Sequence, residues 1–321
     1  MSDLFSVLEF EKHALEVLPK DIRDYYRSGA GRQETLADNR KAFFRYKIRP
    51  RCLRNVENID LSTVVLGEKI SMPIGIAPSG MQKMAHPMGE IAVVKAAEEM
   101  GVVYTLSTMS TCSIEEVAQA APKAVKWYQV YIYKDRLANF EGTVSEMSQD
   151  PTKGSGLNNY VTDLFDPSIN WEDIKWLKSI TNLPIVLKGI LTAEDALLAV
   201  EAGVAAIQVS NHGSRQLDGT PAAIDALCEV VKAVGEKIEV YIDGGVTDGV
   251  DVLKAVALGA KMALVGRSAL WGLVHSGQQG VERVLNILKN ELRTGLGISG
   301  YSKVDQIDRS LVVHESYYAK L

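Results

Sequence analysis

Short β-branched or otherwise apolar runs recur along the chain and alternate with segments of helical periodicity. Most of these runs begin 21 to 32 residues apart, a spacing typical of the strand–helix units of a parallel sheet. One interval is longer, because 59 residues separate the starts of the third and fourth runs. The sequence therefore predicts a parallel α/β fold with an irregularity near its middle. The predicted strands are 73–79, 103–108, 124–133, 183–190, 205–211, 237–243 and 262–267.

The intervening segments carry the signals that start and stop helices. Ser113 followed by Glu116 is a capping-box pattern, and Thr220-Pro221 predicts a cap and a first turn. Gly203 predicts a helix end. In a chain of 321 residues this alternation favours one α/β barrel over two smaller domains.

A closed barrel of this class has eight strands, and the sequence supplies seven. The polar segment 141–159 contains no convincing buried strand, and 157–165 offers only a poor one. We therefore expect a (β/α)8 TIM-type barrel that lacks one βα unit, and such a sheet must close differently or expose its edges. The chain is predicted to form one domain, 1–321. It divides into a helical N-terminal preface at 1–65, the barrel at 66–275 and a helical C-terminal tail at 276–321.

Charge and composition exclude several classes of function. With 35 Lys and Arg against 40 Asp and Glu, the net charge of −5 provides no broad positive field for a nucleic acid. No apolar run reaches about 18 residues, and the N-terminus lacks the basic and apolar regions of a signal peptide, so neither a membrane span nor secretion is expected. Cys52, Cys112 and Cys228 form no C-x-x-C pair, so we expect free thiols and no metal site.

The chain ends in a small-basic-leucine tripeptide, Ala319-Lys320-Leu321, which is close to the S-K-L peroxisomal address. We therefore expect import into the peroxisome through the receptor that reads such endings. The cysteine usage agrees with a reducing compartment.

The densest chemical signal is the string SNHGSRQLD at 210–218, which directly follows a predicted strand. The catalytic face of a barrel lies at these strand ends. His212 and Arg215 stand three residues apart on a glycine-containing loop, so both can converge on one small anion. A neutral imidazole can take a proton, and a guanidinium binds a carboxylate at two points. Either residue alone suits an ordinary loop, but the complete string indicates an active site.

The string resembles the S-N-H-G-x-R-Q-L-D signature of FMN-dependent 2-hydroxy-acid oxidases and dehydrogenases, the glycolate oxidase family, with Ser214 at its variable position. The similarity extends over almost the whole chain, which implies the barrel fold and FMN as the cofactor. Other matching stretches are 24–30 (DYYRSGA), 76–81 (IAPSGM), 82–87 (QKMAHP) and 127–131 (WYQVY).

The resemblance implies a role for each matching residue. His212 would be the active-site base, Arg215 would bind the substrate carboxylate, and Tyr25 and Tyr131 would offer hydroxyl groups to the substrate. The expected FMN contacts are Ser79, Gly80, Ser107, Gln129, Lys188, Ser210, Asp243, Gly244, Gly245, Gly266 and Arg267.

Two groups of these cofactor residues also follow from their own chemistry. Lys188 ends a predicted strand, and a buried ammonium needs an anionic partner such as a reduced flavin; a Schiff-base lysine of a barrel aldolase is the alternative. The glycines of 243–245 and 266–267 follow the last two strands, where barrels bind phosphate. There is no G-x-G-x-x-G motif after a strand and no P-loop, which argues against a dinucleotide or ATP enzyme.

The chain also departs from the family's pattern. Members have a further helix and strand after the Tyr131 strand, followed by a loop with a second carboxylate-binding arginine. Here 134–136 (KDR) runs directly into 137–140 (LANF), so we expect a βα unit of ~30 residues or more to be missing. Thr247 stands where the family has an arginine on the flavin phosphate, and Met109 where an aromatic lines the substrate pocket.

The expected function is FMN-dependent oxidation of an (S)-2-hydroxy acid to a 2-oxo acid, with reduction of dioxygen to hydrogen peroxide. Met109 in place of an aromatic residue favours longer aliphatic acids. The resemblance also implies a homo-oligomer, a tetramer or an octamer. Two alternatives remain: a catalytically impaired flavin-binding paralogue or splice form, and a flavin-free barrel lyase.

Overall fold

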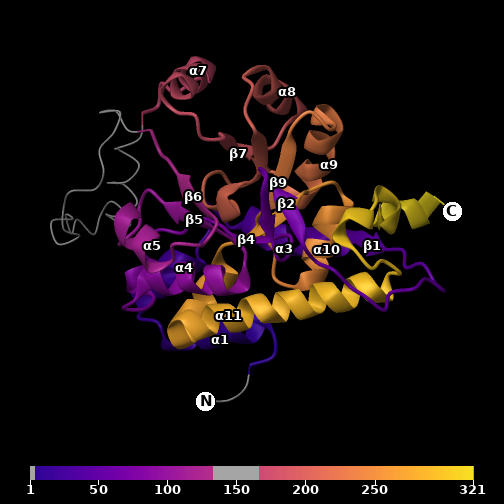
Figure 1. The fold of residues 1–321 in the computed structure, drawn as a ribbon, viewed down its shortest axis with the longest axis horizontal. Helices are drawn as coiled ribbons and strands as arrows, with labels where there is room; N and C mark the ends of the chain where they lie inside the picture. Colours follow the sequence, from indigo (N-terminus) through magenta and orange to yellow (C-terminus); the bar gives the residue numbers. More distant parts are fainter. Residues whose placement is uncertain (1–3, 133–165, 321) are drawn as a thin grey trace.

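A computed structural model describes residues 4–132 and 166–320 of the chain. Its centre is a seven-stranded parallel sheet with the order β6-β5-β4-β10-β9-β8-β7 (Figure 1). All seven predicted strands are confirmed, each somewhat shorter than expected. They are β4 (Ile74–Ile76), β5 (Val103–Ser107), β6 (Lys126–Gln129), β7 (Val186–Ile190), β8 (Ala206–Val209), β9 (Glu239–Asp243) and β10 (Met262–Val265).

The sheet is curled but not closed by the residues described. β6 and β7 stand at the two ends of the strand order, and neither pairs with the other. Over the described residues, the curled sheet thus has the seven strands and the unpaired ends predicted for a TIM-type barrel that lacks one βα unit. The weak strand expected at 157–165 lies outside the described residues.

Helices lie around the outside of the sheet (Figure 1). The capping box predicted at Ser113 is present, since Ser113 Oγ accepts from the Glu116 amide at 3.1 Å. The helix start predicted at Thr220-Pro221 is wrong by two residues, because the carbonyls of these residues accept from Thr35 and Asn211 instead. These helices are α4 (Gly89–Met100), α5 (Ile114–Ala120), α7 (Trp171–Ile180), α8 (Ala193–Glu201), α9 (Ala223–Val234), α10 (Gly249–Ala257) and α11 (Arg267–Ile298).

The N-terminal preface and the C-terminal tail are joined to each other. The preface contains α1 (Val7–Val17), α2 (Lys20–Arg27) and α3 (Glu34–Arg45). β1 (Tyr46–Ile48) then pairs in antiparallel fashion with β11 (Val312–His314), so the tail is not wholly helical. α11 crosses the expected boundary at 275–276 and bends there, at Ser276 and Gly277.

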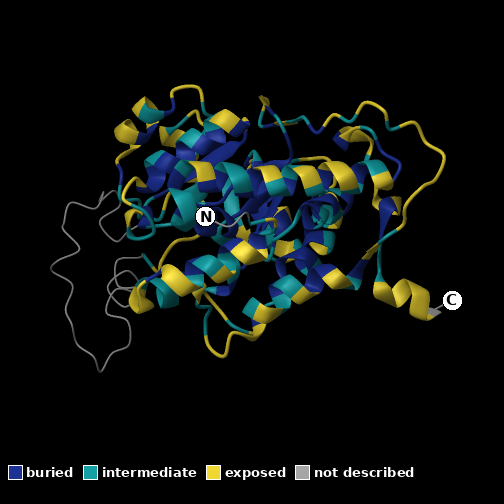
Figure 2. Ribbon diagram, turned by 90° about the horizontal axis from the view of Figure 1, so that it is seen from below, coloured by how far each residue is buried: buried dark blue, intermediate teal, exposed yellow. Residues whose placement is uncertain are grey.

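A hairpin of β2 (Thr63–Val65) and β3 (Glu68–Ile70) lies at the amino end of β9, where the amide of Leu66 donates to the carboxylate of Glu239. Its Val65 and Ile70 pack into a small interior cluster with buried residues of β5, β8, β9 and β10 and with Ala77, which follows β4. A larger cluster lies between the sheet and the helices, where Figure 2 shows the buried residues on the helix faces that point inward. Burial of this apolar area, at about 25 cal/mol per Å², is the main stabilising contribution to such a fold.

The ends of the sheet are less well covered than its centre. The residues of β6 and β7 are only partly buried or exposed, and α7 has no buried residue. Leu183, just before β7, is 76% exposed. Among the described residues, no helix has both the length and the apolar content needed to cross a membrane.

Candidate active site

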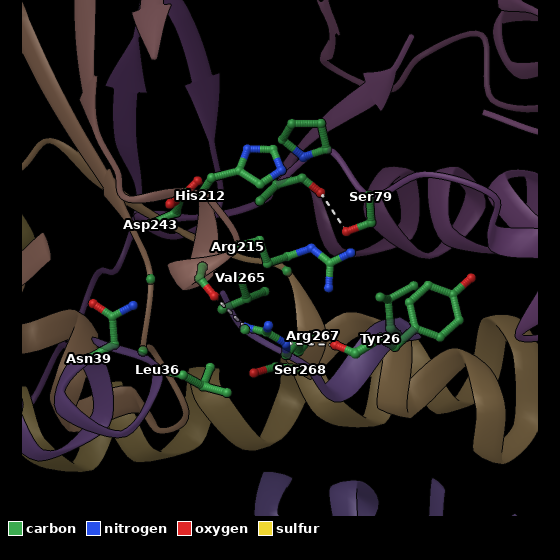
Figure 3. A pocket seen from close by; sticks show the side chains of 18 of the residues that line it. Tyr26, Leu36, Asn39, Ser79, His212, Arg215, Asp243, Val265, Arg267 and Ser268 are labelled. Carbon is green, nitrogen blue, oxygen red and sulfur yellow. Dashed lines mark hydrogen bonds between the residues drawn. The ribbon is translucent and has the colours of Figure 1, made fainter. Parts of the chain in front are cut away.

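A cavity of about 770 Å³ opens at the carboxyl ends of the strands. This volume is within the range of small-molecule and cofactor sites, and the position is the catalytic face of a barrel. All of the predicted site residues line the cavity except Ser210, whose hydroxyl bonds to the Asp243 carboxylate behind it. Figure 3 shows His212, Arg215 and Arg267 within this cavity.

The loop after β8 holds an unusual backbone. His212, Gly213 and Ser214 all have positive φ, at 56°, 60° and 65°. Two of these three are not glycine, so the conformation is strained and must be held by its surroundings. Asn211 does this, because its Oδ1 accepts from the Ser214 amide at 3.1 Å while its side chain pairs reciprocally with Asn39 of α3 at 2.8 and 2.9 Å.

His212 is set up as a base. Its Nδ1 lies 3.4 Å from the Lys188 ammonium. Burial, followed by the charges of Lys188, Arg215 and Arg267, holds the pKa of His212 well below its usual value. The imidazole is therefore neutral near pH 7 and can accept a proton.

Arg215 offers a guanidinium to an anion. It donates from Nη1 to the backbone carbonyls of Tyr25 and Ser28, at 2.6 and 3.1 Å, and lies 4.9 Å from the centre of the Tyr25 ring. No carboxylate among the described residues lies within 4 Å of it. Burial raises the pKa of Tyr25, so its hydroxyl remains protonated beside this charge.

Lys188 has an anionic partner within the protein. Its Nζ lies 3.5 Å from Asp243 Oδ2, the carboxylate that also accepts from Gln208 at 2.6 Å and from Ser210. Asp243 was predicted only as a cofactor contact, and its pairing with Lys188 was missed. Lys188 is therefore held between Asp243 and His212 on the cavity wall, which does not favour a Schiff-base site.

The glycines after β9 and β10 leave room beside the cavity. Gly244 and Gly245 have φ of 103° and 82°, and a Cβ on Gly245 would lie 2.1 Å from the Asn39 carbonyl oxygen. A Cβ on Gly266 would meet nothing closer than 3.9 Å. Only glycine fits at 245, and its loop presents backbone to the cavity.

Arg267 lies deeper than the sequence suggests. It donates to the carbonyls of Tyr26 and Ser28 at 2.8 Å and of Gly213 at 3.0 Å, so it ties α2 to the signature loop (Figure 3). Burial, with the nearby charge of Arg215, lowers the pKa of Arg267 to about 10. The guanidinium stays charged at neutral pH and shares the Ser28 carbonyl with Arg215.

The donor set fits FMN. A glycine loop and the cationic Arg267 suit a phosphate, while Lys188 and the backbone at Ser79 and Gly80 border a space of adequate volume for a flavin ring. Ser107 and Gln129 bond to each other at 3.3 Å on the far wall, and Tyr131 follows them.

Several residues that position the site were not predicted. Asp218 accepts from the amides of Glu34 and Thr35 and so caps α3, and Tyr26 donates to the Met81 carbonyl at 2.7 Å. Asp218 belongs to the signature string, which was a usable signal. Asn39 lies far away in the sequence and carried no such signal.

Comparison with known proteins agrees with this geometry. A family model described as FMN-dependent dehydrogenase matches residues 14–143 and 139–314. 2-Hydroxyacid oxidase 1 of Homo sapiens is 48% identical over 356 residues, covering 96% of each chain. Glycolate oxidase of Spinacia oleracea is 44% identical over 353 residues, covering 96% of this chain and 95% of the relative. The structure of mandelate oxidase with (S)-4-hydroxymandelic acid superposes with a TM-score of 0.90 at 34% identity, covering 97% of this chain and 98% of the other.

The same comparisons bear on the missing βα unit. The alignment with the human relative is longer than the 321 residues of this chain, so it contains gaps on the side of this chain. The two stretches matched by the family model meet at 139–143, close to where the sequence departs from the family's pattern. The shortening therefore falls between β6 and β7, the two strands left at the ends of the sheet.

Proposed function

Because the chain belongs to the FMN-dependent dehydrogenase family, we propose that it is an (S)-2-hydroxy-acid oxidase. It would oxidise the hydroxy acid to a 2-oxo acid and pass the electrons to dioxygen, which gives hydrogen peroxide. The observation that carries the proposal is the meeting of a neutral His212 with an Arg215 that has no carboxylate partner among the described residues, in one cavity. The names of the relatives, 2-hydroxyacid oxidase and glycolate oxidase, support it.

Each substrate contact has a physical basis. The substrate carboxylate would bind Arg215, with the hydroxyls of Tyr25 and Tyr131 as further partners. His212 would accept the proton that leaves the substrate, and its low pKa keeps it ready to do so. Lys188, held by Asp243, would keep a positive charge beside the cofactor and so stabilise the negative charge that forms there on reduction.

FMN, when bound, supplies the acceptor for the two electrons that leave the substrate. The glycine loops 243–245 and 266–267 would hold its phosphate, through backbone amides and the Arg267 guanidinium. The remaining residues proposed to contact it are Ser79, Gly80, Ser107, Gln129, Lys188 and Ser210.

The wider setting of the enzyme is part of the same proposal. The chain would form one domain, 1–321, and assemble into a tetramer or an octamer. The ending Ala319-Lys320-Leu321 would direct it to the peroxisome, and a peroxisomal relative of Arabidopsis thaliana that is 44% identical supports this. In Figure 1 the last described helix, Glu315–Lys320, projects away from the body of the fold, which agrees with this proposal.

A second candidate is a flavin-binding protein with impaired turnover. The chain is shortened between β6 and β7, the two strands at the open ends of the sheet. In the family's pattern this segment carries the second carboxylate-binding arginine, so its loss favours impaired turnover. In that case Arg215 would have to hold the substrate with tyrosine hydroxyls alone.

Product analysis separates the two candidates. Purified protein is supplied with 2-hydroxyoctanoate, glycolate and L-lactate in air, and hydrogen peroxide and 2-oxo acid are measured together. Equal amounts of both products, abolished by His212→Ala, are expected for the oxidase. Bound FMN with neither product from any of these acids would establish the impaired protein instead.

A further inference from the structure

The phosphate end of the cavity lacks a cation that the family's pattern provides. At the position of that arginine stands Thr247, which lines the cavity. Its amide donates to Asp251 Oδ2 at 3.0 Å and its hydroxyl donates to the same oxygen at 3.3 Å. Thr247 therefore serves to position the start of α10 and adds no positive charge.

A different arginine, from the N-terminal preface, borders the same loop. α3 packs directly against Gly245, since a Cβ there would lie 2.1 Å from the Asn39 carbonyl oxygen and 3.2 Å from the Arg40 amide nitrogen. Figure 3 shows Asn39, the residue before Arg40, at this edge of the cavity. Arg40 itself is among the residues that line the cavity.

Glu11 orients the Arg40 guanidinium but bonds to only one of its three nitrogen atoms. Its Nη2 donates to both carboxylate oxygens of Glu11, at 2.7 and 2.8 Å. Among the described residues, all hydrogen bonds of the Arg40 side chain are these two, so Nε and Nη1 remain for another acceptor. The side chain is 40% exposed, whereas that of Glu11 is 16% exposed, so Glu11 provides a fixed support for α3's arginine.

Arg40 and Arg267 act on the same region electrostatically. The positive charge of Arg40 contributes to lowering the pKa of Arg267, after burial and Arg215. The carboxylates of Glu11 and Asp243 offset this repulsion on Arg267 in part, and an anion bound near both guanidinium groups would offset it further. A phosphate on the glycine loop would be such an anion.

We propose that Arg40 is a cofactor-binding residue that supplies the second positive charge for the phosphate of FMN, in place of the arginine absent at 247. This inference rests on the proposed phosphate position at Gly244, Gly245 and Arg267. It assigns to α3 a role beyond packing, and it makes the Glu11–Arg40 pair a support of the cofactor site.

The test compares two flavins that differ only in the phosphate. Full-length apoprotein is titrated with FMN and with riboflavin, and binding is followed by quenching of flavin fluorescence. Arg40→Gln is expected to weaken FMN binding about tenfold, the lower end for a charge-assisted hydrogen bond, and to leave riboflavin binding unchanged. Lys41→Gln removes the same charge from the neighbouring exposed position and is expected to change neither. In the Arg40→Gln background, Thr247→Arg is expected to restore FMN affinity.

Failure of the proposed phosphate site and failure of the role of Arg40 give different binding results. If wild-type protein binds riboflavin as tightly as FMN, the proposed phosphate site itself is wrong and the role of Arg40 falls with it. If the wild type prefers FMN but Arg40→Gln behaves like Lys41→Gln, or weakens both flavins equally, only the role of Arg40 is overturned.

Discussion

The five central strands of the curled sheet, its covered side, are more completely buried than the two strands at its ends, its open side. On the covered side, β5, β4, β10, β9 and β8 are buried almost throughout. On the open side, β6 and β7 are partly exposed and α7 has no buried residue. His212, Arg215 and the glycine loops follow strands of the covered side, whereas the open side contributes Gln129, Tyr131 and Lys188. A βα unit can therefore be lost while most of the chemistry keeps its support, because each loop is positioned by its own neighbours.

The largest effect is expected at His212, which follows β8 of the covered side. His212→Ala is expected to lower the rate of flavin reduction by about 10²–10⁴-fold, because the proton acceptor is lost while the cofactor contacts remain. Stopped-flow absorbance with a saturating 2-hydroxy acid measures this rate. Retention of the yellow flavin spectrum in the variant is the control, and a rate within a factor of two of wild type would exclude His212 as the base.

Alanine substitution at two glycines with positive φ compares the loss of stability on the covered side with the loss on the open side. Gly245→Ala is expected to lower the free energy of unfolding by about 3–5 kcal/mol, since its Cβ would collide with the Asn39 carbonyl as well as strain the backbone. Gly189→Ala, on β7, meets nothing within 4 Å and is expected to cost only about 1–2 kcal/mol. Urea denaturation measures both values, and equal losses would show that the contact of α3 with the glycine loop is absent.

The pH dependence follows from the depressed pKa of His212. Below pH 6.5 the unfolded chain binds a proton at this residue that the folded protein does not yet bind. The free energy of unfolding should therefore fall as the pH falls from 6.5 towards the folded pKa, and His212→Ala should flatten this slope. Over the same window kcat/KM should stay level, because the base is still neutral. A decline of kcat/KM centred at 6.5 or above would contradict the assigned pKa direction.

The smallest effect is expected at the open side. Leu183→Ser should change the free energy of unfolding by no more than about 0.5 kcal/mol, since this leucine is 76% exposed. Leu264→Ala on β10, where the side chain is 1% exposed, is the matched core variant and should cost about 2–5 kcal/mol. A large loss at Leu183 would mean that the open side is covered in solution.

Local sequence patterns predicted the strands of the fold but not the contacts between segments that are distant in the sequence. The strands were predictable because apolar runs and their spacing are local properties. The pairing of β1 with β11 and the Asn39–Asn211 amide pair join residues from opposite parts of the chain, and no local pattern encodes them. The helix start expected at Thr220 failed for the same reason, since its carbonyl is taken by Thr35 of α3. The candidate site was named through the signature string, but the orientation of Arg267 required the fold.

We expect the site to hold FMN and to oxidise a 2-hydroxy acid although the chain is shortened between β6 and β7. The most direct test of this claim is the visible absorbance of the purified full-length protein before and after anaerobic addition of 2-hydroxyoctanoate. We expect a flavin spectrum that bleaches on addition of the acid and returns when air is admitted. A flavin spectrum that persists unchanged with this acid, and with glycolate and L-lactate, would contradict it.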